Sequence, residues 1–394
     1  MHERLIYLDH AATTPVDARV VAAMTPYYTT HFGNPSSIHA AGRMALEAVD
    51  AARETVAAIL GASRKEIIFT GGGTESDNLA IKGVAQAQRT AGRGAHIITS
   101  AIEHHAVLHA VESLQAQGFA ATVLPVDRQG LVRPEDLRAA IRPDTVLATI
   151  MYANNEIGSI QPLAELGAIC REAGVLLHSD AVQAAGALPL NVKALNVDFL
   201  TLAAHKFYGP KGVGVLYARH GTPLWPQING GGQERRRRAG TENVAGIVGQ
   251  AMALRLADQR RASDAEHCRT LRDRLIGQVL ERVPFTALNG SASERLPNNA
   301  NISFEFIEGE SLLLLLDQQG ICASSGSACT SGALEASHVL SALGVDHQQA
   351  IGAVRFSVGK DTRPEDIDFV TDALPAMVER LRSVSPAYRR AVGR

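Results

Sequence analysis

The segment from residue 197 to 215 joins an apolar strand pattern to a lysine and a glycine-rich turn. It is Val-Asp-Phe-Leu-Thr-Leu-Ala-Ala-His-Lys-Phe-Tyr-Gly-Pro-Lys-Gly-Val-Gly-Val. The apolar run predicts a buried β-strand that stops at His205 and Lys206. Burial there favours the neutral amine of Lys206, which can attack a carbonyl carbon and form a Schiff base. The alternative is a lysine in a surface turn, since buried lysines are rare.

A second apolar run, Val175-Leu-Leu-His-Ser-Asp-Ala-Val-Gln183, ends in the carboxylate of Asp180. A strand-end aspartate and a strand-end lysine are what pyridoxal phosphate requires. The carboxylate keeps the pyridine nitrogen protonated, and the lysine carries the aldehyde carbon. Gln183 is placed to reach the phenolic oxygen of the ring. The alternative role for Asp180 is that of a helix N-cap after a strand.

A glycine-rich turn offers an anion site. Residues 65–70 predict a strand, Gly71-Gly-Gly-Thr74 a tight turn, and residues 75–89 a helix. Glycines let the backbone approach an anion, and the free N–H groups of a helix N-terminus bind it. The spacing fits neither a Walker A loop nor a dinucleotide fingerprint. By itself the turn is better explained as a simple connection between a strand and a helix, but beside Asp180 and Lys206 it predicts a phosphate site.

Three histidines, His104, His105 and His109, follow the predicted strand from residue 96 to 100. They do not share one helical face cleanly and form no H-E-x-x-H motif, so we predict no metal site. A histidine at a strand end suits stacking on an aromatic ring and proton transfer near neutral pH. We assign that role to His104 and expect His105 and His109 to be structural.

Cys329 lies among small residues in Ser-Gly-Ser-Ala-Cys-Thr-Ser-Gly. A reactive thiol needs exposure, whereas a structural cysteine sits among apolar neighbours, and the alternative for Cys329 is an accidental loop cysteine. We expect Cys170, Cys268 and Cys322 to be structural. Four thiols without C-x-x-C pairing argue against a zinc site or a disulfide framework and favour a reducing compartment.

Length and charge suit an enzyme of cytoplasmic type. The 394 residues can bury two domain cores, and 38 Lys and Arg against 40 Asp and Glu leave a net charge of −2. Bulk electrostatics therefore recruits neither nucleic acid nor membrane, and no apolar stretch approaches the roughly 20 residues of a spanning helix. The chain enters its first motif at Tyr7, so we expect no signal or transit peptide.

Strand and helix patterns alternate from about residue 16 to 257, which is typical of an α/β layer sheet. Short apolar runs such as residues 144–151 predict strands that are buried on both faces. Residues 251–283 predict a long charged amphipathic helix that connects two domains. A smaller α+β domain is expected after it, from the patterns at 300–306, 310–316 and 351–358.

The ordered motifs resemble the class V, fold-type I pyridoxal-phosphate cysteine desulfurases of the NifS/IscS group. The motifs are Tyr7–Pro15, Phe32–Ser37, Gly73–Asn78, Glu103-His104, Asn154–Gly158, Asp180–Gln183, His205-Lys206, Gly230–Arg235, Arg238–Thr241 and Ser324–Gly332. The resemblance covers nearly the whole chain, and it is closer to NifS and IscS than to the SufS-like group.

This resemblance implies an aspartate aminotransferase-like fold, with a seven-stranded, mixed, mostly parallel sheet in a large domain of residues 16–257. Residues 1–15 and 258–394 would form the small domain that carries the Cys329 loop. It implies a homodimer that uses pyridoxal 5′-phosphate to convert L-cysteine to L-alanine. The sulfur would leave as a persulfide on Cys329 for an iron–sulfur scaffold or another acceptor protein.

The resemblance also assigns residues. Lys206 and His104 would carry protons, and Cys329 would attack the substrate sulfur. Arg355 would bind the substrate carboxylate, and Asn155 would help to hold that carboxylate or the ring oxygen. The cofactor ligands would be Lys206, Asp180, Gln183, Gly73, Thr74, His104, Asn155, His205 and, from the second subunit, Thr241. A surface strand position is the alternative for Arg355.

Two further sequence features concern the predicted phosphate site. The IscS pattern has a phosphate-binding serine three residues before the lysine, and Ala203 stands there, so one hydroxyl donor is lost. The run Arg235-Arg-Arg-Arg238 is either a solvated face or an anion site at a subunit boundary.

Three other functions share part of this pattern. An aminotransferase of the same fold would use Lys206 and Asp180 but would not need Cys329. A selenocysteine lyase would share all of these residues. A non-enzymatic sulfur carrier would keep Cys329 but would have no need of Asp180 and Lys206. The sequence does not identify the sulfur acceptor.

Overall fold

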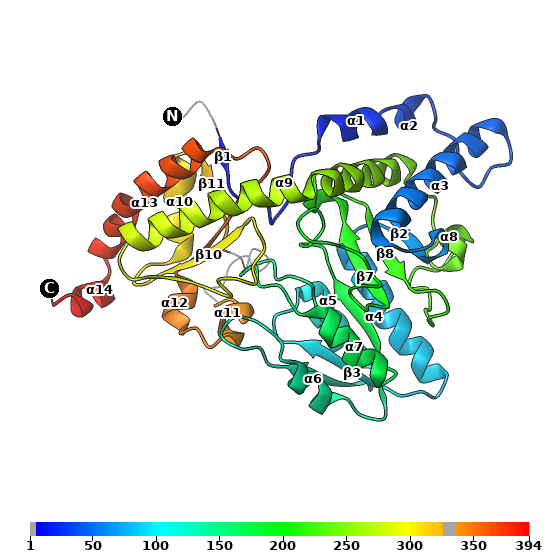
Figure 1. The fold of residues 1–394 in the computed structure, drawn as a ribbon, viewed down its shortest axis with the longest axis horizontal. Coiled ribbons are helices and arrows are strands. Elements are labelled where there is room, and N and C mark those ends of the chain that lie inside the picture. Colours follow the sequence, from blue (N-terminus) through cyan, green and yellow to red (C-terminus); the bar gives the residue numbers. More distant parts are fainter. Residues whose placement is uncertain (1–4, 326–335, 394) are drawn as a thin grey trace.

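The computed structural model describes residues 5–325 and 336–393, and its centre is a seven-stranded sheet (Figure 1). The strand order is β2 (Ile67–Thr70), β8 (Gly214–Ala218), β7 (Phe199–Ala203), β6 (Leu176–Asp180), β5 (Thr145–Thr149), β3 (His96–Ser100) and β4 (Ala120–Leu124). Strand β8 pairs antiparallel with both of its neighbours, and all other pairs are parallel. The predicted fold class, with a mixed and mostly parallel seven-stranded sheet, is confirmed.

Helices cover both faces of this sheet, which is why most of its strands are apolar throughout. Side-chain alternation divides each strand between the two faces. Ile97 packs in the cluster of α4 (Gly73–Thr90) and α5 (His105–Gln115), whereas its neighbour Ile98 packs in the cluster of α3 (Ala40–Leu60) and α7 (Leu163–Glu172). The smaller helices of this part are α1 (Ala18–Met24), α2 (Pro26–Thr29), α6 (Pro134–Ala140) and α8 (Gln233–Arg236).

A second, smaller layer is built on a three-stranded antiparallel sheet. Strand β10 (Asn299–Phe304) lies between β9 (Thr286–Leu288) and β12 (Ala353–Ser357), and β1 (Ile6–Tyr7) pairs parallel with β11 (Ile321–Cys322). Its helices are α10 (Gly309–Gln318), α11 (His338–Ala342), α12 (His347–Ile351), α13 (Pro364–Ser383) and α14 (Pro386–Ala391). A separate apolar core joins β1, β10, β12, α10 and α13.

One long helix, α9 (Val244–Arg282), joins these two parts (Figure 1). Ile247 and Leu254 from its first half belong to the core of the large sheet, and Leu271 and Leu275 from its second half belong to the core of the small one. The predicted helix is present but begins earlier than residue 251, because Asn243 caps its N-terminus by accepting a hydrogen bond from the N–H of Gly246. The domain division at residues 257 and 258 stays a prediction, which the two cores favour.

Some predicted bounds are wrong around the glycine turn. Residues 65 and 66 lie in a 3₁₀ turn, Arg64–Glu66, and not in the strand, because the Glu66 carboxylate accepts hydrogen bonds from the N–H groups of Ser63 and His220. Helix α4 begins at Gly73 and not at residue 75. Gly72, at φ +152°, turns the chain between strand and helix, so Gly73 and Thr74 enter the first helical turn.

Two further bounds differ at the ends of strands. Lys206 lies in a 3₁₀ turn, Ala204–Lys206, directly after β7. Strand β12 begins at Ala353, because Ile351 ends α12. No helix in the described part of the chain is long and apolar enough to cross a membrane.

Candidate active site

Most of the residues singled out in the sequence meet in one cavity of about 360 Å³. It lies where β6 ends at Asp180 and β7 is followed by Lys206, the edge at which open α/β sheets bind ligands. The predicted residues that line it are Gly73, Thr74, His104, Asn155, Asp180, Gln183, His205, Lys206 and Arg355. The sheet, the first turns of α4 and α5, and strand β12 therefore contribute to one site.

Lys206 is held by the N-terminal segment of the chain. Its Nζ donates hydrogen bonds to the carbonyl oxygens of Ala11, at 2.6 Å, and Ala12, at 2.8 Å. Gln183 Nε2 donates to the same Ala11 oxygen at 2.9 Å. Carbonyl acceptors favour the ammonium form while desolvation favours the amine, so the neutral lysine stays a prediction.

Asp180 is a buried carboxylate, with only 6% of its surface exposed. Its Oδ1 accepts a hydrogen bond from the N–H of Val182 at 2.9 Å. Burial raises the pKa of Asp180, while His104 and Lys206 act in the opposite direction. A buried carboxylate of this kind calls for a cationic or N–H partner, which a protonated ring nitrogen provides.

The part of the cavity at the start of α4 is suited to an anion. The N–H groups in the first turn of α4, starting at Gly73, have no acceptor within the helix and carry the positive end of its dipole. A Cβ on Gly73 would lie 3.0 Å from Val182 Cγ2 and 3.5 Å from Ala203 Cβ, so glycine keeps this approach open. Ala203 lines the cavity and brings no hydroxyl group.

His205 lies on the same side of the cavity. Its Nδ1 is 3.2 Å from Thr13 Oγ1. Burial, with help from the charges of Lys206 and Lys211, lowers the pKa of His205 to about 4. The imidazole is therefore neutral at pH 7 and acts through its hydrogen bonds and not through charge.

His104 caps helix α5. Its Nδ1 accepts a hydrogen bond from the N–H of Ala106 at 3.1 Å, which leaves Nε2 to carry the proton of the neutral ring. Burial lowers the pKa of His104. The ring is thus able to take up and return a proton within the cavity.

Two more histidines line the cavity. The ring of His105 is 4.9 Å from that of His338 and 5.0 Å from that of His109, with which it stacks. His105, expected to be structural, therefore faces the site together with His338. Within residues 5–325 and 336–393, no three His, Cys, Asp or Glu side chains group as metal ligands.

Arg355 on β12 is 3% exposed and reaches the cavity from the small sheet. Its Nη2 donates to Asp9 Oδ1 at 2.8 Å and its Nη1 to the carbonyl oxygen of Asn155 at 2.9 Å. Its buried Nε has no hydrogen-bond partner among the described residues. The guanidinium is therefore held in place with a donor to spare for a carboxylate.

Two acidic residues of the cavity were missed in the sequence. Glu156 accepts a hydrogen bond from Ser337 Oγ at 2.5 Å, and burial raises its pKa. Asp77 Oδ1 is buried without a hydrogen-bond partner among the described residues, 3.5 Å from His178 Nε2. Burial and the nearby Asp180 raise the pKa of Asp77. The one signal in the sequence was that Asp77 is an acidic residue on a helix face whose other buried residues are mostly apolar. A single residue of this kind is a weak signal.

Two predicted residues are not in the described cavity. Thr241 is exposed and does not line the cavity of its own chain. Cys329 lies outside the described residues. Burial raises the thiol pKa of Cys170 and Cys268 to about 12, and it also raises that of Cys322. None of these three thiols is poised to ionise near neutral pH.

The comparisons with known proteins agree with this geometry. The model of the family described as aminotransferase class-V matches residues 6–370. The chain belongs to this family. It is 54% identical to a cysteine desulfurase IscS of Methanosarcina thermophila, over 97% of this chain and 94% of that protein. The family membership and the IscS/NifS-like resemblance are thus confirmed.

Solved structures also superpose on the chain. A "NifS-like protein" has a TM-score of 0.89 at 39% identity, covering 97% of this chain and 100% of that one. A structure titled "SspA in complex with cysteine" has a TM-score of 0.79 at 36% identity, covering 90% of this chain and 99% of that one. The similarity extends over both the large and the small sheet.

The family's cysteine desulfurases use pyridoxal 5′-phosphate, and the residues of the cavity fit this group. A helix N-terminus suits its phosphate, a buried carboxylate suits its ring nitrogen, and Lys206 suits its aldehyde carbon. Asp77 Oδ1, buried without a hydrogen-bond partner in the described part of the chain, marks a polar floor that a polar ligand completes.

Proposed function

We propose that this chain is a pyridoxal-phosphate-dependent cysteine desulfurase that converts L-cysteine to L-alanine and transfers the sulfur to Cys329. The observation that carries the proposal is the convergence of Lys206, Asp180 and Arg355 on one cavity. The bound cofactor supplies an electrophilic carbon for the substrate amine and a ring that accepts electrons from the substrate Cα.

The chain's own residues position the substrate and move protons. Arg355 binds the substrate carboxylate, because its guanidinium is already fixed by Asp9 and by the Asn155 backbone. Lys206 and His104 remove and return the substrate protons from within the cavity. Asp180 keeps the ring nitrogen charged by its own negative charge.

The transfer of sulfur to Cys329 forms one bond and breaks one bond. The thiolate of Cys329 attacks the substrate sulfur, so that an S–S bond forms while the substrate C–S bond breaks. The electron pair of the C–S bond stays on the carbon, which is then protonated, and alanine results. The persulfide on Cys329 is the form in which sulfur passes to an acceptor.

Assembly and cellular role are further parts of the proposal. The chain forms a homodimer in which Thr241 reaches the phosphate of the partner's site, with Thr74 and His205 supplied by the same subunit. The persulfide serves an iron–sulfur scaffold or another sulfur-acceptor protein in the cytoplasm. The exposure of Thr241 away from its own cavity supports the shared site.

The test is the reaction of the purified holoprotein with L-cysteine and a thiol reductant. We expect alanine and sulfide in equal amounts and a change in the visible absorption when cysteine is added. A 2-oxo acid product without alanine would indicate an aminotransferase. A large preference for selenocysteine in the same assay would indicate a selenocysteine lyase.

A further inference from the structure

Tyr208, two residues after Lys206, has an unusual backbone conformation. Its φ of +64° lies in the left-handed region, which bulky residues rarely adopt. Such a conformation persists where surrounding contacts enforce it, and it often marks a functional constraint. The contacts around Tyr208 show what enforces it.

The backbone of Tyr208 is tied to the N-terminal segment. Its N–H donates to Thr14 Oγ1 at 2.7 Å, and its carbonyl oxygen accepts from the N–H of Asp17 at 3.0 Å. Thr14 also donates to the carbonyl oxygen of His205, from both its N–H and its Oγ1, at 2.9 Å each. The same segment supplies the carbonyl groups that hold Lys206 Nζ. The turn and the lysine therefore share one support.

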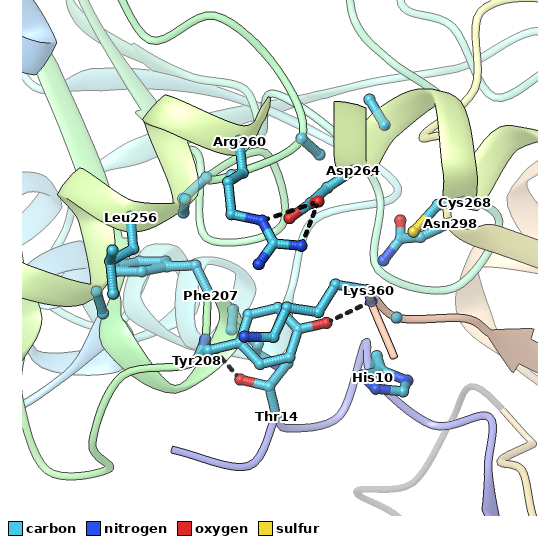
Figure 2. A pocket seen from close by; sticks show the side chains of 18 of the residues that line it. His10, Thr14, Phe207, Tyr208, Leu256, Arg260, Asp264, Cys268, Asn298 and Lys360 are labelled. Carbon is cyan, nitrogen blue, oxygen red and sulfur yellow. Dashed lines mark hydrogen bonds and ion pairs between the residues drawn. The ribbon is translucent and has the colours of Figure 1, made fainter. Parts of the chain in front are cut away.

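The side chain of Tyr208 is tied to the small sheet. Its hydroxyl oxygen accepts from the N–H of Lys360 at 2.9 Å, and Lys360 Nζ lies 4.4 Å from the ring centre (Figure 2). Lys360 Nζ also donates to Asp17 Oδ2 at 2.6 Å. Lys360 follows β12, the strand that carries Arg355. Tyr208 thus links the lysine turn to the strand that binds the substrate carboxylate.

A cavity of about 80 Å³ lies beside this link (Figure 2). His10, Gln183, Lys206, Tyr208 and Lys360 are among its lining residues, and part of its wall is apolar. A turn that borders a cavity is not fixed by close packing of protein side chains on that side. Its position therefore depends on the hydrogen bonds of Tyr208 more than it would in a filled core.

We propose that Tyr208 is a positioning residue that directs Lys206 into the active-site cavity and couples it to strand β12. The inference rests on the proposed function, because it concerns the proton transfers of Lys206. Burial raises the pKa of Tyr208, so the phenol stays neutral at working pH and acts by its hydrogen bond and its ring. It does not touch the reacting atoms.

The main test is Tyr208→Phe in the holoprotein, which keeps the ring and removes the hydroxyl acceptor. We expect kcat for alanine to fall about tenfold with KM for cysteine within about twofold, since misplacing a catalytic group slows chemistry more than binding. The pH midpoint of the visible absorption of the resting holoprotein should move by about half a unit or more, because the surroundings of Lys206 change.

Lys360→Met provides an independent variant, since it removes the charge over the ring but keeps the backbone donor. It should shift the pH midpoint of the visible absorption in the same direction as Tyr208→Phe, by a smaller amount. The double variant should lose less than the product of the two single losses, because both act through one link. Should Tyr208→Phe fail to fold, Lys360→Met carries the test alone.

The matched control is Tyr217→Phe, a buried tyrosine on β8 that does not line the active-site cavity. It should keep both kcat and the pH midpoint. An unchanged midpoint and kcat in Tyr208→Phe, with an active wild-type enzyme, would overturn this inference alone. A wild-type holoprotein that makes no alanine would instead overturn the proposed function.

Discussion

Lys206 illustrates how one residue depends on distant parts of the chain. It stands directly after β7, yet its Nζ donates to the carbonyl oxygen of Ala11, 195 residues away in the sequence. The local strand and turn deliver the side chain to the sheet edge. The N-terminal segment then fixes the amino group at the place where a carbonyl carbon has to be attacked.

Replacing Lys206 by alanine should abolish alanine production and the visible absorption of the covalently bound cofactor. The fold should persist, because one partly exposed side chain is lost and the two apolar cores are untouched. Absorption spectra and a thermal melt followed by circular dichroism would check this. Retained activity would point to Lys211 as the anchor instead.

Cys329→Ser should still bind the cofactor and cysteine but make almost no alanine and no persulfide. A hydroxyl group is far less nucleophilic toward sulfur than a thiolate. Alanine variants of Cys170, Cys268 and Cys322 are the controls and should keep nearly full turnover. Mass spectrometry of the protein after one turnover would locate the added sulfur, and its presence on another cysteine would contradict the assignment.

The buried carboxyl group of Glu103 makes stability depend on pH. Burial raises its pKa from 4.5 to about 8, so the folded state holds a proton that the unfolded state loses. Its contribution is therefore complete below pH 4.5 and declines as the pH rises toward 8. Glu103→Gln, which mimics the neutral acid, should gain stability relative to wild type between pH 5 and pH 8.

The gain should reach at most a few kcal/mol, since each pKa unit corresponds to about 1.4 kcal/mol. Urea midpoints at the two pH values would measure it, with Glu112→Gln on the outer part of α5 as a control. If the stabilities of Glu103→Gln and wild type changed in parallel with pH, the Glu103 carboxyl group would not keep its proton in the folded state.

At the scale of elements, the buried ion pair of Arg53 and Glu234 connects the turn at α8 to helix α3 and strand β2. Arg53 on α3 donates to both carboxylate oxygens of Glu234 at 2.8 Å, and the Phe69 N–H on β2 donates to Glu234 Oε2 at 3.1 Å. Glu234, Arg235 and Arg236 all have positive φ values, which cost energy in residues with a side chain. The ion pair holds this unfavourable turn, which precedes Thr241.

Glu234→Gln should lower the free energy of unfolding by about 3 kcal/mol, because it leaves the Arg53 charge buried without a counter-charge. The double variant Arg53→Met with Glu234→Leu should recover part of that loss. Urea denaturation of the wild type and these two variants would measure the changes. Equal stability of Glu234→Gln and wild type would mean that the pair does not hold the turn.

At the scale of the whole molecule, the site is expected to be complete only in a dimer. Thr241 is exposed on its own chain, and its hydroxyl group does not line the described cavity. Mixing Lys206→Ala subunits with Thr241→Ala subunits should restore part of the activity, since one of the two sites in the heterodimer then has both residues. Sedimentation would establish the dimer, and no recovery despite proven subunit exchange would place Thr241 in its own subunit's site.

Local sequence patterns predicted several strands of the large sheet and the polar residues that follow them, since apolar runs and glycine turns act over a few residues. They placed Asp180, Lys206 and Gly73 at one edge, and the ordered motifs indicated the family. Local hydrogen bonds moved several bounds, such as the start of β2 at Ile67, after the turn that Glu66 holds.

Only the tertiary structure decided which distant residues meet. Arg355 with Asp9, Glu156 with Ser337, His105 with His338, and Tyr208 with Lys360 are pairs far apart in the chain. No local periodicity links such partners, because their contact depends on how α9 and the N-terminal segment bring the small sheet against the large one.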